Sequence, residues 1–104
     1  MIVYQNLKDR QAQPCTLRYV GDASVVEADI AAVLLDVGER RLRNGYEQFA
    51  LLFRVADGGV PRQGVYAVTL SALPTEEWFL VPVGQNSDGI LYEATFNRLV
   101  PTNE

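Results

Sequence analysis

Apolar side chains recur at every second position along most of the second half of this chain, and this period of two constrains the fold more than any other feature. The alternating sets are Phe49, Leu51 and Phe53, then Tyr66, Val68 and Leu70, and finally Ile90, Tyr92, Ala94 and Phe96. Successive side chains of a β-strand point to opposite faces of its sheet, so each set predicts a strand with one face in a core.

The connections between these segments favour antiparallel pairing. Gly and Pro residues cluster at 57–64, 72–75 and 84–89, and none of these stretches has the dozen or more residues of a helical crossover. The segment 77–83 is apolar at nearly every position, which predicts a strand buried on both faces that ends near Pro82. We therefore expect an all-β fold, a single antiparallel barrel or sandwich of about six or seven strands.

The first half of the chain is less regular. Residues 4–11 predict a short N-terminal helix, which Pro14 ends, and 15–20 then alternate as a strand. Residues 27–37 admit a helix because they are rich in Ala and Leu, or a strand because they also alternate. The strand is the preferred interpretation, because the later strands need partners.

Asn44-Gly45 is typical of a two-residue type I′ hairpin turn. A continuous register from that turn would set Phe53 opposite Asp36 and Phe49 opposite Arg40, with apolar side chains against charge. The pattern thus argues against the hairpin and predicts an extended loop over 38–46, with the next strand beginning near Glu47.

The inventory of reactive side chains is short. The 104 residues include no histidine and one cysteine, Cys15, so histidine-based metal sites and Ser-His-Asp or Cys-His nucleophiles cannot be assembled from one chain. Carboxylates at 76–77, 88 and 93 are better explained as solvated strand ends, and 85–89 as a hairpin turn, than as a catalytic pair or a calcium loop. We expect a single β-domain over 1–104 with no catalytic residue, metal or cofactor.

The net charge of −4 falls entirely within residues 55–104, because acidic and basic side chains balance in 1–54. Such a protein lacks the broad basic surface that drives nucleic-acid binding. The one basic cluster is Arg40, Arg41 and Arg43, which is a candidate contact for a protein partner because Arg pairs bidentately with carboxylates.

Trp78 and Phe79 are neighbours in a predicted strand, so they must point to opposite faces. One of the two rings lies outside a single core, and it either packs under the N-terminal segment or lies at an interface. Both are therefore candidate partner contacts, and a protein partner or self-association is expected.

The expected location is the cytoplasm, with no membrane association. No apolar run approaches the 18 or so residues of a membrane helix, and residues 1–20 contain no basic segment followed by an apolar one.

Four segments carry a resemblance to a known family. They are Phe49-Ala50-Leu51-Leu52-Phe53, Gln63-Gly64-Val65-Tyr66, Phe79-Leu80-Val81-Pro82-Val83 and Tyr92-Glu93-Ala94-Thr95-Phe96-Asn97. In order and spacing they resemble a small bacterial β-domain family of unknown function, although Gln48 and Ala50 stand where that family often has Ser. The resemblance implies an accessory role in phage-tail-like particles, since such domains are often encoded near phage-tail-collar or microcystin-dependent-type proteins, and it assigns no catalytic residue.

Two hypotheses on function follow. The first is a non-enzymatic structural or interaction protein, which the resemblance extends to a tail-like particle. The alternative is a β-barrel that binds a small ligand in an apolar cavity near the Gly58-Gly59 and Gly84–Gly89 loops.

Overall fold

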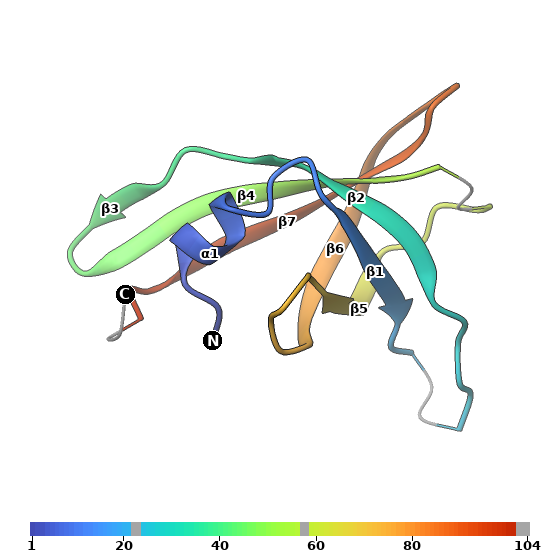
Figure 1. Ribbon diagram of the computed structural model, residues 1–104, viewed down its shortest axis with the longest axis horizontal. Helices are drawn as coiled ribbons and strands as arrows, with labels where there is room; N and C mark the ends of the chain where they lie inside the picture. The colour runs from blue at the N-terminus through green and yellow to red at the C-terminus, as the bar shows by residue number, and fades with distance from the viewer. Residues whose placement is uncertain (22–23, 57–58, 102–104) are drawn as a thin grey trace.

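The computed structural model describes residues 1–21, 24–56 and 59–101, which form one short helix and seven strands arranged as in Figure 1. Helix α1 spans Tyr4–Lys8. The strands are β1 (Pro14–Tyr19), β2 (Ile30–Val37), β3 (Arg41–Arg43), β4 (Tyr46–Val55), β5 (Gly64–Thr69), β6 (Glu76–Asn86) and β7 (Gly89–Leu99). The predicted N-terminal helix is thus present, and residues 30–37 form a strand and not a helix.

The sheet closes on itself. Its strands follow the order β2-β1-β5-β6-β7-β4-β3, every pair is antiparallel, and a further pairing of β2 with β4 completes a barrel of six strands. Strand β3 is the extra strand, because within the described part of the chain it pairs with the end of β4 alone. The predicted all-β class is confirmed, and of the two architectures considered the barrel is the one formed.

The interior of the barrel is filled by side chains from the predicted alternating positions. Alternate residues of β4 are buried while their neighbours are half-buried or exposed, and β7 follows the same rule as far as Ala94. Those with almost no exposed surface include Leu7, Leu17, Leu34, Leu51, Phe53, Val68, Leu80 and Ile90. Burying one such side chain contributes roughly 1.5–3 kcal/mol, so this core holds the barrel together without a disulfide.

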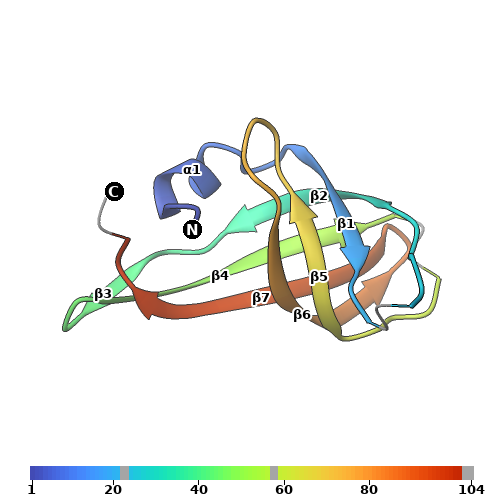
Figure 2. The same cartoon turned by 90° about the horizontal axis from the view of Figure 1, so that it is seen from below.

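Residues 1–13 cover one end of the barrel (Figure 2). Leu7 of α1 is fully buried in the core. The Tyr4 hydroxyl donates to the Gly38 carbonyl at 2.8 Å, and the Lys8 ammonium donates to the Val37 carbonyl at 3.2 Å. The helix is therefore fixed to the end of β2 by both packing and hydrogen bonds. Within the described residues, no helix has the length and apolar character needed to span a membrane.

The hairpin at Asn44-Gly45 does form, so the prediction of a loop over 38–46 was wrong. Asn44 and Gly45 have φ of 53° and 82°, as a type I′ turn requires, and Arg43 faces Tyr46 across it. The pairing is not continuous. The register between β2 and β4 shifts between Leu34 and Asp36, and it shifts again between β2 and β3. These two shifts place Phe53 opposite Leu34 and Leu51 opposite Val37, which removes the conflict that argued against the turn.

The prediction for residues 77–83 was also wrong. Only alternate residues of this part of β6 are buried, because the side chains between them lie on the outside of the barrel wall. The strand continues to Asn86, four residues beyond Pro82, since a register shift between Pro82 and Gly84 absorbs the residue that lacks an N–H group.

Candidate functional site

The β3–β4 hairpin projects beyond the closed part of the barrel, as Figure 2 shows at its left end. Arg41 and Arg43 are exposed at alternate positions of β3 and so share one face of it. Leu42 lies on the other face and is 62% exposed. Strand β3 of this hairpin therefore presents two arginines on one face and an apolar side chain on the other.

Arg40 does not belong with the other two arginines. Its guanidinium lies 3.2 Å from a carboxylate oxygen of Glu47 and 5.1 Å from the centre of the Tyr4 ring. The predicted cluster Arg40, Arg41 and Arg43 is therefore divided, with one arginine turned toward the N-terminal segment and two facing solvent.

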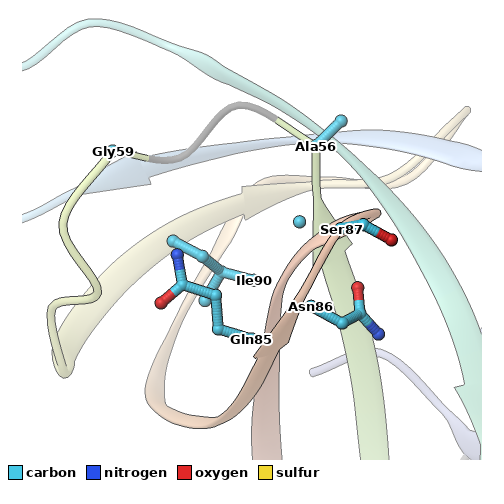
Figure 3. Close-up of a pocket in the computed structure, with 7 residues that line it drawn as sticks. Ala56, Gly59, Gln85, Asn86, Ser87 and Ile90 are labelled. Atoms are coloured by element: carbon cyan, nitrogen blue, oxygen red, sulfur yellow. The ribbon is translucent and has the colours of Figure 1, made fainter.

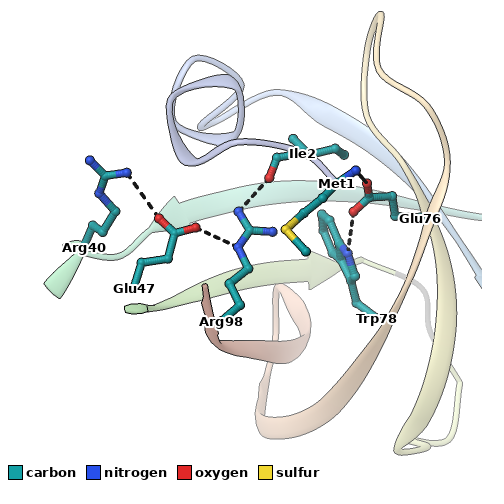
Figure 4. A network of polar contacts seen from close by, with 7 residues as sticks. All are labelled: Met1, Ile2, Arg40, Glu47, Glu76, Trp78 and Arg98. Carbon is teal, nitrogen blue, oxygen red and sulfur yellow. Dashed lines mark hydrogen bonds and ion pairs between the residues drawn. The ribbon is translucent and has the colours of Figure 1, made fainter. Parts of the chain in front are cut away.

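Glu47 is fully buried at the base of this hairpin, with both carboxylate oxygens paired (Figure 4). Arg98 Nε donates to its second oxygen at 2.7 Å, and Arg98 also donates to the Ile2 carbonyl at 2.6 Å. The rings of Phe49 and Phe96 lie within 5.4 Å and 5.3 Å of the Arg98 guanidinium. One carboxylate thus joins the hairpin, strand β7 and the N-terminal segment.

Trp78 and Phe79 point to opposite sides of the barrel wall, as predicted. Trp78 is 8% exposed, its ring packs against Phe96 at 5.1 Å between centres, and its indole N–H donates to Glu76 at 3.2 Å. Phe79 is 53% exposed on the outer face, where Val65 of β5 is its cross-strand neighbour. Phe79 and Val65 form an apolar pair on the outside of the barrel.

A groove of about 440 Å³ lies where β6 and β7 separate, past their last pair at Val81 and Glu93. The Met1 amino group lies 3.2 Å from Glu76 within it. Its lining residues are Met1, Glu76, Glu77, Trp78, Phe96 and Arg98.

A smaller pocket of about 270 Å³ lies at the other end of the barrel (Figure 3). It is bounded by Gly59 and by the β6–β7 turn, close to where the ligand-binding hypothesis expected a cavity; Gly58 lies outside the described residues. Gln85, Asn86 and Ser87 line it, so its lining is mainly polar where an apolar lining was expected. The residues 85–89 form the predicted hairpin turn.

Three tyrosines and Arg62 close this same end of the barrel. The Tyr66 hydroxyl donates to the Arg62 carbonyl at 2.5 Å, and the Arg62 N–H donates to the Tyr92 hydroxyl at 3.2 Å. Burial, followed by the neighbouring Tyr92 hydroxyl, raises the pKa of Tyr66. The Arg62 guanidinium lies 3.5 Å from the centre of the Tyr19 ring, and its hydrogen bond to Glu27 raises its pKa. These contacts hold the segment before β5 against the barrel.

Cys15 lies at the start of β1, with its thiol in the core. Burial raises the pKa of this thiol to about 11, so little thiolate is present at neutral pH. Among residues 1–21, 24–56 and 59–101, no three His, Cys, Asp or Glu side chains lie close enough together to hold a metal ion.

Two features of the ends of the barrel were missed at the level of sequence. The Glu47–Arg98 pair has a detectable signal, since Glu47 continues the in-facing series of Phe49, Leu51 and Phe53, and a carboxylate on that face needs a cationic partner. The tyrosine cluster has no such signal, because its members come from three separate strands and a loop.

The fold defines the chain as a small closed β-barrel of six antiparallel strands with one short N-terminal helix and a protruding hairpin. A family model described as a domain of unknown function, DUF6916, matches residues 4–96, and the chain belongs to this family. No curated protein and no solved structure matches the chain.

Proposed function

We propose that this protein is a non-enzymatic interaction module that associates with a protein partner through the outside of its barrel. The observation that carries this proposal is the exposed cross-strand pair of Phe79 and Val65, with Val83, 51% exposed, further along β6. Aromatic side chains are enriched at protein interfaces, where burying a ring of this size contributes substantially to affinity.

The filled interior supports the same proposal. Side chains occupy the barrel lumen, and the grooves described above lie at its ends and on its surface. The outer surface is therefore the part of this fold that a partner can reach.

The partner class that we propose is a component of a phage-tail-like particle. The support for it is the resemblance of four segments of the chain to small domains encoded near tail-collar proteins. Membership of a domain family of unknown function is compatible with this role but is not evidence for it.

The test is capture of the products of neighbouring genes by the purified chain, with size-exclusion chromatography and light scattering to detect self-association. We expect at least one stable complex, which Phe79→Ser weakens and Val60→Ser leaves unchanged, because Val60 is 84% exposed and lies in a loop. A strict monomer that captures none of these products would overturn the proposal.

A second candidate function is the binding of a small polar ligand in the pocket beside Gly59. The polar lining by Gln85, Asn86 and Ser87 is the observation that favours it. A thermal-shift screen over sugars, nucleotides and lipids tests this candidate, and no stabilisation by any of them would remove it.

A further inference from the structure

We infer that the outer edge of β3 binds an extended acidic segment of the partner protein, which pairs with this edge as an added strand. This inference rests on the proposed function and names the partner's chemistry and a second contact surface for it. The recognised segment alternates acidic and apolar residues.

The first observation is an open strand edge. Among the residues that the structure describes, β3 is the last strand in the order of the sheet and pairs with β4 on one side only. In a two-residue hairpin, the residues that flank the turn exchange their hydrogen bonds, and the next pair does not. Arg43 and Arg41 therefore direct their backbone groups to β4, whereas Leu42 directs its N–H and carbonyl outward, where a further strand can accept and donate.

The second observation is the chemistry of the two faces. Arg41 and Arg43 are exposed on one face, and neither forms an ion pair with any described residue, Glu39 included. Leu42 is exposed on the opposite face. A paired segment would place alternate side chains beside these two faces, so the residues beside the arginines are acidic and the one beside Leu42 is apolar.

Charge excludes a second copy of this chain as the occupant. Antiparallel pairing of two β3 strands about Leu42 would set Arg41 of each copy beside Arg43 of the other, on one face. Like charges directly opposite one another destabilise a sheet. Arginines at an edge thus prevent self-pairing and at the same time select an acidic partner strand.

The β3–β4 hairpin is also held in place in the absence of a partner. The buried Glu47 carboxylate binds Arg40, which precedes β3, and Arg98 of β7. Because these contacts order the hairpin in advance, the hairpin itself loses less conformational freedom in forming the complex.

The test uses the full chain and a blocked peptide in which Glu alternates with Val, with a peptide of the same composition but with its Glu residues contiguous as the control. Binding is followed by calorimetry and by amide chemical shifts. We expect the alternating peptide to bind more tightly, to shift the Leu42 and Arg43 amides, and to weaken as salt rises. Equal binding of the two peptides, or shifts confined to other strands, would overturn the inference.

Two kinds of variant separate the backbone from the charges. Leu42→Pro removes the outward donor but none of the β3–β4 hydrogen bonds, so we expect about a tenfold or greater loss of affinity, whereas Leu42→Ala retains the donor and most of the binding. The double change Arg41→Glu and Arg43→Glu leaves the backbone intact and should abolish binding even if Leu42→Pro does not fold.

The same variants distinguish this inference from the proposed function. If a captured partner is lost with Phe79→Ser and retained with Arg41→Glu/Arg43→Glu, the protein is an interaction module and the β3 edge is not its contact. If no partner is captured by the unaltered chain, the proposed function itself fails.

Discussion

Glu47 and Arg98 lie 51 residues apart in the sequence and are joined by a 2.7 Å hydrogen bond from Arg98 Nε to a carboxylate that has no exposed surface. The pair links the base of the β3–β4 hairpin to the end of β7. A buried carboxylate is tolerated here because Arg40 satisfies its other oxygen.

Glu47→Gln removes that charge and leaves two arginines facing a neutral amide. We expect the free energy of unfolding to fall by roughly 3–5 kcal/mol, measured by urea denaturation, since breaking a buried ion pair leaves uncompensated charge. Glu77→Gln, on the exposed face of β6, is the control and should change stability by less than about 0.5 kcal/mol. Equal effects of the two changes would contradict the role assigned to Glu47.

Trp78 and Phe79 should differ sharply when each is replaced by Ala. Trp78→Ala opens a cavity beside Phe96 and Phe53, and we expect a loss of about 3–5 kcal/mol. Phe79→Ala removes an exposed ring and should cost less than about 1 kcal/mol. Thermal unfolding of the two variants measures the difference, and similar melting temperatures would mean that the two side chains are not oriented as described.

Gly89 and Gly45 both have positive φ but differ in the space around them. A Cβ at Gly89 would lie 2.1 Å from the Val55 carbonyl oxygen, whereas one at Gly45 has no atom within 4 Å. Gly45→Ala should cost about 1–2 kcal/mol from backbone strain alone. Gly89→Ala must also displace β4, so we expect it to be the more destabilising change or to prevent folding. Urea denaturation compares them, and the reverse order would refute this packing.

Stability should decline at alkaline pH. The folded state holds the protons of Cys15 and Tyr66 more tightly than the unfolded chain does, because burial raises the pKa of both groups. Their contribution is complete at pH 8 and is lost as the pH rises, from about 9 for the thiol and from about 10 for the phenol.

Urea denaturation between pH 8 and 11 measures this decline. Cys15→Ala should flatten the part between pH 9 and 11, and Tyr66→Phe the part above pH 10. Tyr66→Phe should also cost about 1 kcal/mol at pH 8, because its hydrogen bond to the Arg62 carbonyl is lost. A variant curve parallel to that of the unaltered protein would show that the replaced group does not titrate differently on folding.

The fold class followed from the sequence because the alternation of Phe49, Leu51 and Phe53 is a local property, and burial of one face is its direct consequence. The hairpin at Asn44-Gly45 was rejected because the sequence does not show how the distant strands pair. Its turn chemistry was correct, but the two register shifts between β2, β3 and β4 depend on how the barrel closes, which no local pattern contains.

The candidate site was predictable in part for the same reason. The opposite orientations of Trp78 and Phe79 follow from strand geometry alone. The division of the arginines does not, since Arg40 turns toward Glu47, which the β3–β4 hairpin places beside it, and toward Tyr4, which comes from the distant N-terminal segment.

The place of β4 in the barrel has a consequence for how the chain folds. Strand β4 pairs along its whole length with β7, so the pairing of Tyr46 requires Leu99, which lies more than 50 residues later in the sequence. Pairing β4 with β7 closes the long segment of chain between them, which costs conformational entropy. Proteins dominated by such distant contacts fold slowly, in milliseconds to seconds. During synthesis, one edge of β4 therefore stays unpaired until β7 has emerged from the ribosome, and an unpaired strand edge is prone to aggregation.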